Sequence, residues 1–224
     1  MHSGFVIGFV ALLGLAPAVQ AQDPSVTFNL FTLENAYINH TYSFNAAYTA
    51  KYNIPIEVPF VLQVPIRKDV ELIADGHPDG GIVKFTFVTK GAEGRNFIEH
   101  IHVVDAVFPI PQSSENPMSA RLQVAARLLA ESAYPSAVQG RADAKMIGTR
   151  EISVNGMRAA EVLATYSDPV NGPIVLQLTA IPHPLRAESY FTSRNISRTL
   201  VPMTGPEQLP ETLGGRVLDS FTYE

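Results

Sequence analysis

Two Asn-Gly pairs, at residues 155–156 and 171–172, separate three strand-like runs in the second half of the chain. The runs cover residues 146–154, 157–167 and 173–182. Asn and Gly both accept the positive φ that a type I′ turn requires, so an Asn-Gly pair between such runs predicts a β-hairpin. Because a two-residue turn can join only antiparallel strands, the sequence predicts an antiparallel meander here.

Further strands are expected on both sides of this meander. Every second residue is apolar in part of residues 81–90, which is typical of a strand with one buried face: Val83, Phe85 and Phe87. Residues 55–65 contain three prolines, which confine a strand there to a sheet edge or to short pieces. Residues 96–111 and 187–194 are expected to form two more strands.

The longer of two expected helices spans residues 116–135. Asn116 can cap its N-terminus, and Pro117 suits the first turn, where no intrahelical hydrogen bond is lost. Apolar residues recur at three- and four-residue spacing and form a stripe for packing against a sheet: Met118, Leu122, Ala125, Leu129 and Ala133. Three charged residues are expected off that stripe: Arg121, Arg127 and Glu131.

A shorter helix is expected near the C-terminus, at residues 210–220. Leu213 and Val217 would face the core, while Gly214 and Gly215 weaken the helix because glycine has a low helix propensity. The order of strands, helix, meander and helix predicts an α+β fold in which an antiparallel β-sheet is flanked by two main helices.

The N-terminal segment predicts export. Residues 5–15 are apolar and precede small residues that suit cleavage after Ala21, so we expect a signal peptide at residues 1–21 and a single α+β domain at 22–224. No run is long enough to span a bilayer as a helix, so the mature chain is expected to lack a transmembrane segment. The chain has no cysteine, which excludes a lipid-modified cysteine and leaves the periplasm as the expected location.

The C-terminal part resembles a known family. The segment VNGMRAAEVLATYSDPVNGPIVLQLTAIP and the terminal segment GGRVLDSFTYE are similar to the C-terminal half of PsbP-like domains, over roughly residues 151–224. The resemblance implies a PsbP-like sandwich, an antiparallel sheet flanked by helices, with a role as an accessory or binding module. It carries no functional residue over to this chain.

Two histidines in residues 96–111, His100 and His102, are the candidate metal ligands. Alternate residues of a strand share a face, so both imidazoles should project with Ile98 and Val104, while Glu99 and Asp105 lie on the other face. Zinc needs three or four ligands, and the third would come through a tertiary contact. The histidines that remain as sources are His40, His77 and His183.

Two functions remain open from the sequence. The favoured one is an exported accessory or binding module without catalytic residues or a cofactor, which binds a protein, a lipid or a small molecule in the cell envelope. The alternative is a periplasmic metal-assisted hydrolase that uses His100 and His102. Nucleic acid is not an expected partner, because the net charge is −5 and basic residues do not gather in one block. No G-x-S-x-G nucleophile motif is present.

Overall fold

The computed structural model describes residues 37–76, 80–90, 94–110 and 115–224. The signal peptide expected at residues 1–21 lies outside these ranges. Within them, no helix has the length and the apolar character needed to cross a membrane.

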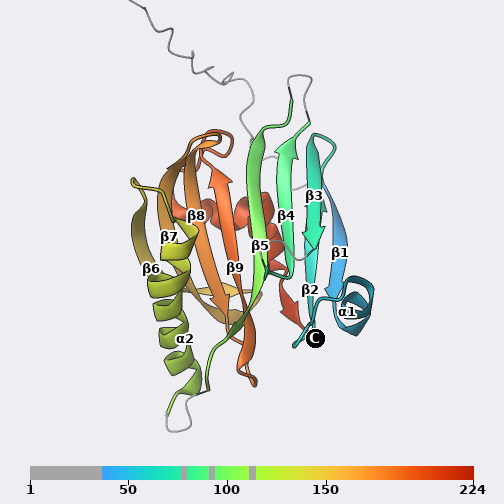
Figure 1. Cartoon of the computed structure of the whole chain (residues 1–224), viewed down its shortest axis with the longest axis vertical. Helices are drawn as coiled ribbons and strands as arrows, with labels where there is room; N and C mark the ends of the chain where they lie inside the picture. The colour runs from blue at the N-terminus through green and yellow to red at the C-terminus, as the bar shows by residue number, and fades with distance from the viewer. Residues whose placement is uncertain (1–36, 77–79, 91–93, 111–114) are drawn as a thin grey trace, which may run out of the picture.

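Seven of the ten strands in the described ranges form an antiparallel sheet in the order β3-β4-β5-β9-β8-β7-β6. Its strands are β3 (Val70–Gly76), β4 (Val83–Thr89), β5 (Phe97–Val107), β6 (Lys145–Val154), β7 (Met157–Asp168), β8 (Gly172–Ile181) and β9 (Glu188–Ser197). Helix α2 (Pro117–Leu128) lies on one face, here called the outer face, and helix α4 (Leu213–Asp219) on the opposite, inner face (Figure 1). The expected α+β fold, an antiparallel sheet flanked by two main helices, is confirmed.

A second sheet packs against the inner face. It has the order β1-β2-β10, formed by β1 (Ile38–Phe44), β2 (Phe60–Ile66) and β10 (Thr222–Tyr223), and helix α1 (Ala46–Tyr52) follows β1. The prolines of residues 55–65 predict an edge strand or short pieces. The strand is short, since β2 begins only after Pro59, but it is the middle strand of the three and not an edge. Strand β10, however, pairs only with Phe60 and Val61. Around Pro65, β2 therefore pairs with β1 on one side and has no β10 residue on the other.

The two predicted hairpin turns are built differently. Asn155 and Gly156 have φ values of 47° and 78°, as the predicted type I′ turn requires. At the second hairpin Asp168 pairs with Gly172, which leaves a three-residue loop at 169–171. Gly172 follows this loop as the first residue of β8 and has φ 72°. The Asp168 carboxylate accepts hydrogen bonds from the backbone N–H groups of Val170 and Asn171, so an aspartate organises this turn.

Two hydrophobic clusters share the seven-stranded sheet. The larger fills the space between the inner face, the three-stranded sheet and α4, where the rings of Phe44 and Phe221 stack on Phe60 with centroids 4.5 Å and 5.1 Å apart. The smaller lies between α2 and the outer face. Alanines on both surfaces, such as Ala125 and Ala160, allow a close approach of helix and sheet.

The helix that begins as α2 follows the predicted stripe, and its helical continuation ends at Ala137, slightly later than expected. The Asn116 side chain accepts a hydrogen bond from Ser119 N at 3.1 Å, which confirms the cap. Beyond Leu128 the helix passes through a π-helical segment, η3 (Leu129–Ala133), and continues as α3 (Tyr134–Ala137). Pro135 therefore does not end the helix. The wider π turn precedes the proline, which has no N–H to donate.

Arg121 is buried, contrary to the prediction that it lies off the packed stripe. Its side chain is satisfied by backbone carbonyl groups: the guanidinium donates to Phe108 O at 3.0 and 3.2 Å and also to His183 O and Arg186 O. These acceptors lie at the end of β5 and in the loop between β8 and β9. Arg121 therefore fixes the start of α2 against two strand ends.

Replacing Leu129 by Ala should lower the free energy of unfolding by about 2–5 kcal/mol, because the side chain is 2% exposed between helix and sheet. Leu128→Ala is the matched control: this neighbour is 42% exposed, and the change should cost less than about 0.5 kcal/mol. Urea unfolding of the two variants measures both values. Equal losses would contradict the described orientation of the helix.

Candidate binding groove

His100 and His102 project from the outer face of β5, as predicted, together with Val104. The prediction that Ile98 shares this face is wrong. The register between β4 and β5 shifts at Phe87 and Val88, so Ile98 turns into the larger core and Phe97 lies beside His100, with ring centroids 5.7 Å apart. A β-bulge of this kind reverses the side-chain alternation on one side of it.

The His100 ring is held in its neutral form. Burial lowers its pKa to about 3, and the charges of Lys84 and His102 act in the same direction. Its Nε2 lies 3.1 Å from Nδ2 of Asn195 on the neighbouring strand β9. Because a side-chain amide nitrogen can only donate, the neutral ring accepts at Nε2, and this nitrogen is already engaged.

The structure does not bring another histidine of the described chain to this pair. His40 lies on β1, in the sheet that packs against the opposite face. His183 lies between β8 and β9, where its Nδ1 accepts hydrogen bonds from the backbone N–H groups of Leu185 and Arg186. His77 lies outside the described residues. Within the described ranges, no group of three His, Cys, Asp or Glu side chains could hold a metal ion.

A groove of about 610 Å³ runs between the outer face and the helical segment α2–η3–α3. It exists because α2 packs over β7 and β8 and leaves the outer face of β5 and β9 uncovered. In Figure 1 the helix lies over the β6–β8 side of the sheet, to the left of β5. The sheet side of the groove is lined by His102, Val104, Ala106, Val107, Phe108, Leu178, Phe191 and Ser193, and the helix side by Leu128, Leu129, Ser132, Ala133, Ser136 and Ala137.

The lining changes from apolar to polar along β5. Near the start of α2 it consists of Phe108, Ala106 and the cross-strand pair Val104 and Phe191. Two residues before Val104 on the same face of β5, His102 pairs with Ser193 across the strands. Two residues earlier again, His100 pairs with Asn195, and this pair lies outside the groove. The groove therefore has an apolar floor and one polar end, the arrangement that orients a small molecule in a binding site.

Two large apolar side chains border the groove and are exposed to solvent. Val107 on β5 is 61% exposed, and Leu128 on α2 is 42% exposed. Single exposed apolar residues are ordinary on a protein surface, but these two flank a continuous apolar concavity. An occupant of the groove would remove them from water.

The His102 ring lies against Gly81, at the start of the segment that leads into β4. A Cβ added at Gly81 would lie 1.9 Å from His102 Nε2, so another residue at this position would force the imidazole to move. Glycine at position 81 thus makes room for the ring that forms the polar end of the groove.

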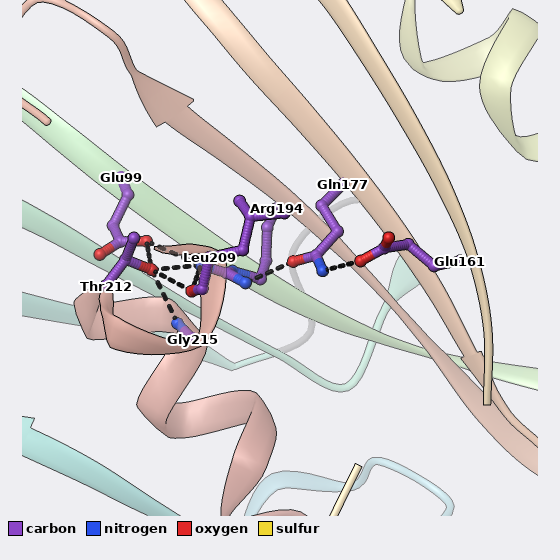
Figure 2. Close-up of polar contacts among 7 residues, drawn as sticks. All are labelled: Glu99, Glu161, Gln177, Arg194, Leu209, Thr212 and Gly215. Carbon is purple, nitrogen blue, oxygen red and sulfur yellow. Dashed lines mark hydrogen bonds and ion pairs between the residues drawn. The ribbon is translucent and has the colours of Figure 1, made fainter. Parts of the chain in front are cut away.

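The inner face carries a second arrangement of polar side chains, shown in Figure 2. Glu99, Arg194, Gln177 and Glu161 project from four adjacent strands and form a buried chain of hydrogen bonds, here called the polar network. Arg194 Nη2 lies 3.3 Å from Glu99 Oε2, and burial lowers the pKa of Arg194 while the Glu99 charge raises it.

The polar network holds the C-terminal helix on the sheet. The Thr212 hydroxyl caps α4 by accepting a hydrogen bond from Gly215 N at 3.0 Å, and it also donates to Glu99 Oε2 at 3.1 Å. Arg194 donates to the same hydroxyl and to Leu209 O in the preceding 3₁₀ segment, η4 (Pro206–Glu211). These contacts pair the buried charges and fix a helix N-terminus, although Glu99 Oε1 and Arg194 Nε are buried without a hydrogen-bond partner among the described residues. We therefore interpret the network as structural.

Gly214 and Gly215 allow this close approach, which goes beyond their predicted role of weakening the helix. A Cβ on Gly214 would lie 2.8 Å from Glu99 Oε2, and a Cβ on Gly215 would lie 2.0 Å from Leu209 O. Any larger residue here would push α4 away from the polar network or from η4.

Neither the groove nor the polar network is predicted by the sequence patterns described above. A groove between a helix and a strand far apart in the chain leaves no local pattern. The network does leave a signal: Glu99, Glu161 and Gln177 interrupt apolar stretches at positions that strand periodicity assigns to a buried face. Polar residues at such positions are expected to be paired.

Comparisons with known proteins show likeness at the level of fold. No protein-family model matches the sequence, and no curated protein matches it either. Among solved structures, CyanoP, the cyanobacterial PsbP of Synechocystis sp. PCC 6803, aligns at 13% identity and TM-score 0.41, over 84% of this chain and 94% of its own.

Two further structures align over a similar extent. LpqN of Mycobacterium tuberculosis, which is involved in cell envelope biogenesis, has 10% identity and TM-score 0.41, over 83% of this chain and 91% of its own. The Saccharomyces cerevisiae Ran-binding protein Mog1p has 11% identity and TM-score 0.40, over 84% and 96%.

The partly buried, neutral His100 predicts a pH dependence of stability. Its pKa is about 3 in the folded chain and near 6.5 in the unfolded chain, so the unfolded chain binds one more proton between these values. The contribution of His100 is therefore fully present above pH 6.5 and is lost as pH falls toward 3, by up to about 1.4 kcal/mol per pH unit. His100→Gln keeps an acceptor for Asn195 and should remove this part of the slope in unfolding measured from pH 7 to 4. Parallel pH profiles of wild type and variant would contradict a partly buried, neutral ring.

Gly215→Ala should destabilise the fold by about 1–3 kcal/mol or more, because the new methyl group collides with backbone atoms of η4. Gly148→Ala in β6 is the control, since an added Cβ there meets nothing within 4 Å. It should be neutral or slightly stabilising, because it restricts the unfolded chain. Thermal unfolding compares the two, and a tolerated alanine at 215 would show that the helix does not lie so close to η4.

Proposed function

We propose that this chain is an exported, non-catalytic binding module that holds an apolar ligand in the groove between α2 and strands β5 and β9. In this proposal residues 1–21 are removed on export, residues 22–224 form one α+β domain, and the protein acts in the periplasm. The observation that carries it is the groove itself, with its apolar floor, its solvent-exposed rim and its polar end at His102 and Ser193.

The composition of the lining supports binding rather than catalysis. Among the described residues that line the groove, His102 is the one titratable side chain. Nucleophilic catalysis pairs a nucleophile with a base that a third group orients. Ser193 is the cross-strand neighbour of His102, but no Asp or Glu is among the described residues that line the groove, so none of these can orient the imidazole as a base. Most of the lining is apolar, as is typical of ligand pockets.

No observation favours the alternative, a metal-assisted hydrolase. His100 and His102 share a face and offer two imidazole ligands, but His100 Nε2 is engaged with Asn195. A catalytic zinc site has three protein ligands and an open position. A bound zinc ion in the test below would be the evidence for the hydrolase.

Native mass spectrometry of the protein purified from its own cells tests export and binding together. The chain mass should correspond to a start at Gln22, and a population should carry an additional apolar small molecule that organic extraction removes. A chain that starts at Met1 would contradict export. One bound zinc ion that disappears in the His100→Ala/His102→Ala double variant would favour the hydrolase instead.

A variant that fills the groove tests whether the ligand binds there. Ala133→Trp puts a large ring into the groove from η3 and should abolish the fluorescence gain of a neutral apolar probe, N-phenyl-1-naphthylamine. Ala142→Trp, at an exposed position in the turn before β6, should leave probe binding intact. If both variants bind the probe as the wild type does, the groove is not the binding site.

A further inference from the structure

The floor of the groove has the length and shape for one extended chain. Six residue steps along β5 separate Phe108 from His102, which corresponds to about 20 Å of strand. Val104, Ala106 and Phe191 form an apolar surface between these ends. An apolar track of this length, in a groove of about 610 Å³ between a sheet and a helix, accommodates a single alkyl chain.

The two ends of the track differ, and the difference orients the chain. At the Phe108 end, hydrogen bonds from Arg121 to Phe108 O join the start of α2 to the end of β5. At the other end, His102 and Ser193 line the groove, and His100 and Asn195 continue the polar surface beyond it. An alkyl chain therefore points its methyl end toward Phe108, and its polar head group lies at His102.

Lys84 supplies a positive charge at this polar end. It pairs directly with His102 across β4 and β5, so the two side chains share the outer face with Cβ atoms about 5 Å apart. The Lys84 charge acts on the neighbouring His100. In the described part of the chain, Lys84 has no carboxylate within salt-bridge distance.

Asp75 limits the negative charge that a head group can carry at the polar end of the groove. It pairs with Lys84 from β3 on the same face, and it is exposed. One ammonium beside one carboxylate suits a head group with a single negative charge. A dianionic phosphate would bring a second negative charge beside Asp75, and Lys84 is the one lysine or arginine in this cross-strand row.

We infer that the ligand of the groove is a single-chain amphipathic carboxylate, of the fatty-acid type, with its alkyl chain along Val104, Ala106 and Phe191 and its carboxylate beside Lys84. This inference rests on the proposed function, because it names the chemical class of the ligand in that groove.

Displacement of N-phenyl-1-naphthylamine from the full chain tests it with ligands of equal chain length at pH 7 and low salt. Decanoate should displace the probe at a concentration about tenfold lower than 1-decanol, and the advantage should shrink at high salt, since an exposed charge pair is screened. Decylamine should be the weakest competitor. Decyl phosphate should bind less tightly than decanoate.

Two variants, one that removes a positive charge and one that removes a negative charge, test whether the preference for decanoate over decanol arises at the polar end of the groove. Lys84→Gln should bring the decanoate-to-decanol ratio to within about twofold, and Asp75→Asn should increase it, because each removes one charge from the same row. Lys90→Gln, an exposed lysine just after β4, is the matched control and should keep the wild-type ratio.

The outcomes separate the two proposals. If decanoate and decanol compete equally in the wild type, the carboxylate assignment fails while the apolar groove stands. Tighter binding of decyl phosphate would replace the carboxylate by a phosphate head group and overturn the inference. If neither competitor displaces the probe, or if the probe does not bind, the proposed function fails as well. A decanoate-to-decanol ratio that stays at its wild-type value in both Lys84→Gln and Asp75→Asn would place the head group elsewhere.

Discussion

The antiparallel pairing of β5 with β9 in the middle of the large sheet is the constraint on which both faces depend. It joins two segments about ninety residues apart in the chain, and it places Glu99 near Arg194 on the inner face and His102 beside Ser193 on the outer face. Closing so long a loop costs conformational entropy, which the contacts on both faces must offset. The inner face contributes a dense aromatic core and a buried ion pair, while the outer face is left partly open.

The polar network on the inner face explains how a short C-terminal helix stays in place. Helix α4 has seven residues, too few for an isolated helix to be stable in water. Its N-terminus is capped by Thr212, and this threonine is in turn held by Glu99 and Arg194. Breaking one partner of such a buried pair leaves an uncompensated charge, so the network confines α4 to one position.

The groove on the outer face follows from where α2 lies, and this position is set by Arg121 and by a stripe of small and apolar residues. The helix meets the alanine-rich surface of β7 and β8 closely, and the neighbouring strands β5 and β9 stay uncovered. An antiparallel sheet with helices hosts many functions, so the groove and not the fold carries the proposed function. The rigid sheet supplies its floor, and the π-helical segment supplies its opposite wall.

Local sequence by itself determined the strands of the meander, the type I′ turn at Asn155 and Gly156, the Asn116 cap and the buried stripe of α2, because periodicity and turn chemistry act within a few residues. Only the tertiary structure decided that Ile98 turns inward, that Arg121 is buried against carbonyl groups and that Gly214 and Gly215 permit contact rather than merely weaken a helix. The histidine pair was placed on the correct face from the sequence, but its surroundings were not. Asn195, Ser193 and the wall of α2 reach it from segments distant in the chain, and such contacts depend on packing between elements, which no local pattern encodes.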